Sequence, residues 1–137
     1  MLALNRNQIK AFTLMEVMIV VAIVGILAAI AVPMYTEQVK KGKRNDAMQA
    51  LLAASEAAER YKAANFSYAG LDGNLGSVFA TQVPVDGGTS YYTLAIEADA
   101  TSYTITATPV NSMAGDGALS INSSGQKRYK TTDPWPK

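Results

Sequence analysis

The chain has 137 residues, 49% of them apolar, and a formal net charge of +1, which leaves room for one small domain with appended segments. It contains no cysteine and no histidine, which excludes disulfides, thiolate or imidazole metal ligands and triad-type nucleophilic catalysis. The small net charge gives no strong field for nucleic acid or acidic substrates, and the scattered carboxylates form no recognisable acid–base pair. We therefore expect a protein that is not an enzyme.

The first long feature is an apolar run over residues 12–32, which holds one charge, Glu16, and one hydroxyl, Thr13. As a helix, 21 residues at about 1.5 Å each span roughly 31 Å, close to the thickness of a bilayer core. A buried core helix would carry a polar face, and a secretory signal peptide would be shorter and end at a small-residue cleavage site. The run therefore predicts a segment that lies in a membrane or among identical apolar helices.

Glu16 is the unusual residue of this run, because an unpaired carboxylate in hydrocarbon costs on the order of 3 kcal/mol or more. If the chain were cut between Ala11 and Phe12, the new α-amine would lie one helical turn before Glu16 and on the same face. The helix dipole also favours an anion at that end. The alternative is an uncut membrane anchor with Glu16 at the level of the lipid headgroups.

The stretch AFTLMEVMIVVAIVGILAAIAVPMY resembles the class III signal of type IV prepilins and of the related type II secretion pseudopilins. The resemblance implies that residues 1–11 are a leader removed by a prepilin peptidase, with cleavage between Ala11 and Phe12 and N-methylation of Phe12. It also implies that Phe12, Thr13 and Glu16 act in assembly, with Glu16 pairing with the amine of a neighbouring subunit. The family usually has glycine where this chain has Ala11, a departure that predicts slower cleavage.

The charges that flank the apolar run give a conflicting orientation. The leader carries Arg6 and Lys10, whereas the other side carries four basic residues within 40–44, so the count of lysine and arginine places the C-terminal side in the cytoplasm. The resemblance implies the reverse: a subunit pool in the bacterial inner membrane and an assembled extracellular pilus. The four basic residues predict a solvated collar near the headgroups, or contacts with acidic neighbours or DNA. The DNA interpretation is weakened by the lack of interleaved aromatic residues.

Gly25 and Pro33 are the conformational weak points of residues 12–33, the hydrophobic membrane and filament-core segment. Pro33 cannot donate to the carbonyl of Ala29, so we expect a kink or helix break, either as an ordinary membrane-helix kink or as unwinding on filament assembly. Residues 34–65 are predicted to be an amphipathic second half of the helix. Their apolar stripe predicts docking onto a sheet and consists of Ala47, Leu51, Ala54, Ala58 and Tyr61.

The remainder of the chain predicts a small sheet. Residues 66–89 are rich in glycine and read as an irregular αβ-loop, and residues 90–137 contain alternating stretches typical of antiparallel strands. We expect an α+β fold, with a long N-terminal helix whose second half packs on a 3–4-stranded antiparallel sheet. This arrangement resembles the type IV pilin architecture, and its sheet is similar to that of the short pilins and minor pilins.

Many such pilins close a C-terminal loop with a disulfide, and the corresponding places here are Asp116 and Pro134. The loop is therefore expected to be held otherwise or to be looser, and Trp135 with Pro134 and Pro136 offers a partial replacement. Pseudopilins often bind calcium in this region, where it takes about six to eight oxygens. Asp116 and Asp133 with loop carbonyls could supply these ligands, but a GDG stretch is more often a simple turn. We therefore expect no cofactor and no metal.

The leading hypothesis is a structural subunit, major or minor, of a type IV pilus with a role in adhesion, twitching motility or DNA uptake. Its expected partners are the prepilin peptidase, identical or homologous pilin subunits, the assembly platform and its motor, the inner membrane and, on the weakest grounds, DNA. The alternatives are a type II secretion pseudopilin and a permanently anchored periplasmic domain that is never cut.

Overall fold

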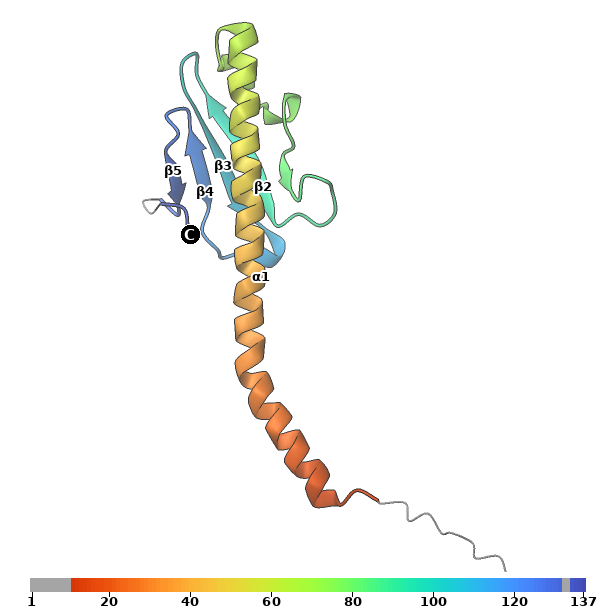
Figure 1. Cartoon of the computed structure of the whole chain (residues 1–137). Helices are drawn as coiled ribbons and strands as arrows, with labels where there is room; N and C mark the ends of the chain where they lie inside the picture. The colour runs from red at the N-terminus through yellow and green to blue at the C-terminus, as the bar shows by residue number, and fades with distance from the viewer. Residues whose placement is uncertain (1–10, 132–133) are drawn as a thin grey trace, which may run out of the picture. The chain divides into compact units, whose positions relative to one another are not determined.

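The computed structural model describes residues 11–131 and 134–137, so the leader residues Arg6 and Lys10, and Asp133, lie outside the described residues. One long helix, α1 (Leu14–Asn65), is followed by a five-stranded sheet (Figure 1). The chain divides within α1 into two compact units, one ending at Gln38 and the other covering Val39–Lys137. The observed class is the predicted one, α+β.

The sheet is an antiparallel meander in which each strand pairs with the next one along the chain, in the order β1-β2-β3-β4-β5. Its strands are β1 (Gln82–Val83), β2 (Tyr92–Ala98), β3 (Tyr103–Pro109), β4 (Leu119–Asn122) and β5 (Lys127–Tyr129). Buried and exposed residues alternate along β2, β3 and β4, as expected for a sheet with one covered face. The prediction of three to four strands missed β1, because two residues are too short to show an alternation.

The covered face of the sheet packs against the second half of α1, as Figure 1 shows for the yellow-green part of the helix. Four members of the predicted stripe are fully buried there, and Tyr61 is partly buried against the same core. Three of the four fully buried stripe residues are alanines, and larger side chains from α1, the sheet and the loops fill the core. The largest fully buried side chains are Tyr92, Leu51, Leu71, Ile105, Met113, Leu119 and Val83.

The connection between α1 and β2 is more structured than the sequence predicts. It contains two short 3₁₀ helices, η1 (Ala69–Leu71) and η2 (Leu75–Ser77), as well as β1. Tyr68, Leu71 and Leu75 are buried in the core. Glycines at regular intervals suggested an irregular loop, but the apolar residues between them anchor it to the domain. A third 3₁₀ helix, η3 (Asn111–Met113), lies between β3 and β4.

Candidate functional site

The N-terminal end of α1 carries the residues predicted to act in cleavage and assembly. Ala11, Phe12 and Thr13 precede the helix and are exposed. The hydroxyl of Thr13 accepts a hydrogen bond from the backbone N–H of Glu16 at 3.1 Å, which makes Thr13 the N-cap of α1. The Thr-x-x-Glu spacing is that of a capping box, a local signal that the sequence carries in addition to the cleavage motif.

Glu16 lies in the first turn of α1 with an exposed side chain. A shallow, mostly apolar hollow of about 280 Å³ is lined by Phe12, Glu16, Val17, Val20 and Val21. The carboxylate thus lies beside Phe12 and at the positive end of the helix dipole, where an anion is stabilised. The arrangement provides a negatively charged acceptor in an apolar setting, suited to binding an amine.

The helix between Leu14 and Gln38 exposes nearly all of its apolar side chains. The large exposed apolar residues of this stretch include Val17, Ile19, Val24, Ile26 and Ile30. By length and composition α1 is able to cross a membrane. This much exposed apolar surface requires a membrane or neighbouring apolar helices to cover it.

Gly25 and Pro33 lie inside α1, which is continuous through both positions. The hydroxyl of Thr36 donates to the carbonyl of Pro33 at 2.9 Å. Because Pro33 has no N–H, the carbonyl one turn before it receives no helical hydrogen bond from this residue. A helix break at Gly25 and Pro33 on assembly stays a prediction.

The predicted basic cluster is divided between solvent and the folded domain. Lys41 is exposed, whereas the Lys43 ammonium donates to the Ser112 hydroxyl at 2.8 Å and lies 5.4 Å from the centre of the Tyr91 ring. Arg44 is drawn further in and binds Asp116. These two side chains fasten the loop around η3 to α1, so the cluster does not form a continuous solvated collar.

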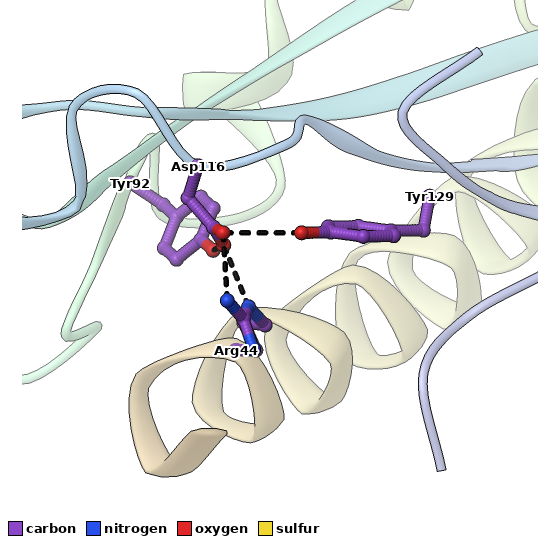
Figure 2. A network of polar contacts seen from close by, with 4 residues as sticks. All are labelled: Arg44, Tyr92, Asp116 and Tyr129. Carbon is purple, nitrogen blue, oxygen red and sulfur yellow. Dashed lines mark hydrogen bonds and ion pairs between the residues drawn. The ribbon is translucent and has the colours of Figure 1, made fainter. Parts of the chain in front are cut away.

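Asp116 is the centre of a polar network that the sequence did not predict (Figure 2). Its two carboxylate oxygens each accept a hydrogen bond of 2.7 Å from the Arg44 guanidinium, and further bonds from the hydroxyls of Tyr92 at 3.1 Å and Tyr129 at 3.0 Å. The Arg44 and Asp116 side chains are only 16% and 11% exposed. The hydrogen bonds from Arg44 hold the pKa of Asp116 at about 2, and Asp116 in turn raises the pKa of Arg44.

This network fastens the loop at the place where related pilins are expected to have a cysteine. Arg44 comes from α1, Tyr92 from β2 and Tyr129 from β5, so Asp116 joins three parts of the domain. Trp135 adds a second fastening, since its indole N–H donates to the carbonyls of Ser120 and Arg128 at 3.0 and 3.1 Å. The Asp116 carboxylate is thus engaged by a guanidinium and by two tyrosine hydroxyls.

Other tyrosine hydroxyls fasten α1 to the rest of the domain in the same way. Tyr68 donates to Glu59 at 2.9 Å, and Tyr91 donates to Asp46 at 2.6 Å. Burial is the largest cause that raises the pKa of each of these tyrosines to about 12, so both remain protonated donors at neutral pH. Tyr91 and Asp46 are 45 positions apart, so their contact has no local sequence pattern, whereas Tyr68 and Glu59 are nine positions apart.

Comparison with known proteins gives two family matches. Residues 6–32 match the prokaryotic N-terminal methylation motif, and residues 33–131 match the family described as type IV minor pilin ComP, DNA uptake sequence receptor. The second match alone covers well over half of the chain. No solved structure matches the chain.

Similar curated proteins come from two kinds of system. The chain is 40% identical over 65 residues to type II secretion system core protein G of Pseudomonas aeruginosa, covering 47% of this chain and 46% of that protein. It is 45% identical over 53 residues to fimbrial protein Q of Moraxella bovis, covering 39% and 34%. It is 58% identical over 36 residues to fimbrial protein EcpB of Eikenella corrodens, covering 26% and 23%. The matched regions span less than half the length of these relatives.

The methylation motif, the long helix with an exposed apolar first half and the small antiparallel sheet agree with the family match over residues 33–131. The chain belongs to the ComP family of type IV minor pilins.

Proposed function

We propose that this protein is a structural subunit of a type IV pilus that takes part in DNA uptake. The observation that carries the proposal is the apolar first half of α1, whose side chains are exposed and whose first turn holds Glu16. Such a helix is suited to storage in the inner membrane and to burial among like helices in a filament. The domain beyond it would then lie on the filament surface.

Proposed processing follows from the geometry of the cap. Cleavage between Ala11 and Phe12 would leave one residue before the Thr13 cap and place a protonated amine near the positive end of the helix dipole. That charge is unfavourable there by itself. A carboxylate at Glu16 offsets it, either within the subunit or in a neighbour, and this gives the acid in the apolar run its role.

The N-terminus and intact mass of the membrane-associated protein, produced with and without a prepilin peptidase, test this processing. We expect a chain that begins at methylated Phe12 only when the peptidase is present. Ala11→Gly, which restores the residue usual in the family, should be cleaved at least as completely. A chain that still begins at Met1 beside an active peptidase would contradict the proposal and favour an uncut anchor.

The proposed role in DNA uptake rests on the family described as a DNA uptake sequence receptor. Binding of duplex DNA by the detergent-solubilised, processed chain tests it directly. We expect affinity to fall with rising salt, because lysine and arginine contacts to phosphates release counterions. Fragments of the species' own chromosome should bind better than fragments of an unrelated genome. Absence of binding at low salt would rule out this role.

The second candidate is a type II secretion pseudopilin, which the similarity to core protein G favours. Deletion of the gene separates the two functions. Loss of surface fibres and of DNA uptake with normal protein secretion supports the pilus subunit, and the reverse pattern supports the pseudopilin.

A further inference from the structure

Charge is segregated along the C-terminal part of the chain. Residues 63–126 contain no lysine or arginine, but they include the acidic residues Asp72, Asp86, Glu97, Asp99 and Asp116. Three basic residues then follow within four positions, at Lys127, Arg128 and Lys130. Because β1 and β5 are the two outer strands of the sheet, Asp86, which follows β1, and this basic group in and next to β5 lie near opposite edges.

A cleft of about 400 Å³ lies beside β1, between that strand with its flanking residues and α1. Its walls include Ala50, Phe79, Pro84 and Val85, which supply apolar surface. Two carboxylates, Asp46 and Asp86, also line it, and both residues are exposed. Val85 is 47% exposed, an apolar side chain without full cover in the isolated subunit.

A cleft that combines apolar wall residues with two carboxylates fits one type of group best, a long aliphatic side chain that ends in a cation. The methylene groups of arginine or lysine pack on apolar walls while the charged end reaches the carboxylates. Arginine fits better, since its planar guanidinium donates to two carboxylate oxygens at once. The same negative charge repels the phosphates of DNA, so nucleic acid does not fit this cleft.

The opposite edge of the sheet presents a matching group. Arg128 is exposed on β5, and its guanidinium donates to the side-chain oxygen of Gln126 at 3.2 Å. Lys127 and Lys130 flank it and are also exposed. Their ammonium groups lie 5.2 Å from the Trp135 ring and 5.4 Å from the Tyr129 ring. The β5 edge therefore presents three exposed basic side chains, two of which lie near aromatic rings.

We propose that the cleft lined by Asp46 and Asp86 binds Arg128 of a second copy of this chain. This proposal rests on the proposed function as a filament subunit. The contact joins two different surfaces, so each subunit has one cleft and one basic edge available for different neighbours. Such a heterologous contact builds an open chain of subunits, as a filament requires, unless the rotation between neighbouring subunits closes a ring.

Cysteine crosslinking tests the contact without background, because the natural chain contains no cysteine. Val85→Cys and Lys130→Cys, combined in one full-length chain, place thiols beside the cleft and beside Arg128. A short bismaleimide applied to sheared filaments and to membranes should give a ladder of oligomers. Each single variant should remain monomeric, since neither surface meets its own copy. Dimers from a single variant, or filaments that contain the double variant without a ladder, would overturn the proposal.

Charge reversal tests the identity of the two partners. In the double-cysteine background, Arg128→Glu should lower the ladder yield at least about fivefold, and adding Asp86→Arg should restore it. Arg60→Glu, at an exposed position on α1, is the matched control and should leave the yield unchanged. An unchanged ladder with weaker DNA binding in Arg128→Glu would identify β5 as a DNA surface and overturn the proposal.

The proposed function is assessed separately, by the presence of the unmodified chain in filaments. Its absence there means that the filament role has failed. Its presence, with a normal level of the double variant and no ladder, means that only this contact has failed.

Discussion

Asp116 shows how one carboxylate can fasten a loop that contains no disulfide. Its bonds to Arg44, Tyr92 and Tyr129 connect the loop before β4 to the helix and to two strands. The network is largely shielded from water, so each partner left without the others would be a poorly solvated polar group. Removing one member should therefore lower the free energy of unfolding by more than breaking an exposed ion pair would.

Arg44→Ala tests this network. We expect the free energy of unfolding of the full chain in detergent to fall by roughly 2–3 kcal/mol, since Asp116 would lose its charged partner while mostly buried. Urea titration followed by the fluorescence of Trp135, the only tryptophan, measures the change. Lys41→Ala, at an exposed position of the same helix, is the control, and an equal effect of both variants would contradict the network's importance.

The same network predicts how stability depends on pH. The folded-state pKa of Asp116 is about 2, lower than its ordinary value of about 4. Its contribution is therefore complete above about pH 4 and is lost as pH falls toward 2, because the unfolded chain binds the proton more readily. Unfolding at a series of pH values should show this acid-side loss. Asp116→Asn should make the free energy of unfolding depend less on pH in this range. An unchanged pH dependence in that variant would contradict the contribution given to Asp116.

Trp135 provides the second fastening of the C-terminal end. Trp135→Phe keeps an aromatic ring but removes the N–H that donates to the carbonyls of Ser120 and Arg128. We expect a loss of roughly 1 kcal/mol in the free energy of unfolding. Far-ultraviolet circular dichroism, used to monitor unfolding, measures this loss. Tyr35→Phe, which removes a hydroxyl from an exposed ring, is the control. No measurable loss in Trp135→Phe would contradict the role of the indole N–H.

At the scale of elements, local patterns predicted the helix, a sheet of three to four strands and the side of α1 that meets the sheet. The alternation of Tyr92, Leu94 and Ile96 was sufficient for β2, for example, because a half-covered strand has a period of two. The stripe on α1 was visible for a similar reason. Element order and fold class followed from these patterns.

Other parts of the structure had no local signal. β1 is fixed by pairing with β2 rather than by its own two residues. Arg44 and Asp116 are 72 positions apart, so their contact depends on the completed fold. The loop of residues 66–89 looked irregular because its glycines are conspicuous, whereas its burial depends on Leu71 and Leu75 meeting a core built from other segments.

Pro33 is the element-scale test of a predicted helix break. Pro33→Ala would restore an N–H for the carbonyl of Ala29 and stiffen α1. If assembly needs the helix to open between Gly25 and Pro33, this variant should fold and enter the membrane normally but reach sheared filaments at a reduced level. Val32→Ala, at the preceding position, is the control. Equal incorporation of Pro33→Ala and the natural chain would argue against the break.

At the scale of the whole molecule, the two units have contrasting surfaces. The unit ending at Gln38 exposes apolar side chains, and the unit from Val39 onward has its own core. A chain of this kind suits a filament in which apolar helices bury one another and domains face outward. Under the proposed function, the membrane and the filament would be two alternative surroundings for the same helix, and Glu16 would be the charged group whose surroundings change between them.

The most direct test of this account is the level of Glu16→Ala in sheared filaments, measured against the membrane pool in the same cells. We expect the variant to be cleaved, folded and membrane-bound, but strongly depleted from filaments, because the amine of Phe12 loses its acidic partner. Glu37→Ala, which removes a carboxylate farther along α1, is the matched control. Glu16→Ala at the natural level in filaments would contradict the central role given to this carboxylate.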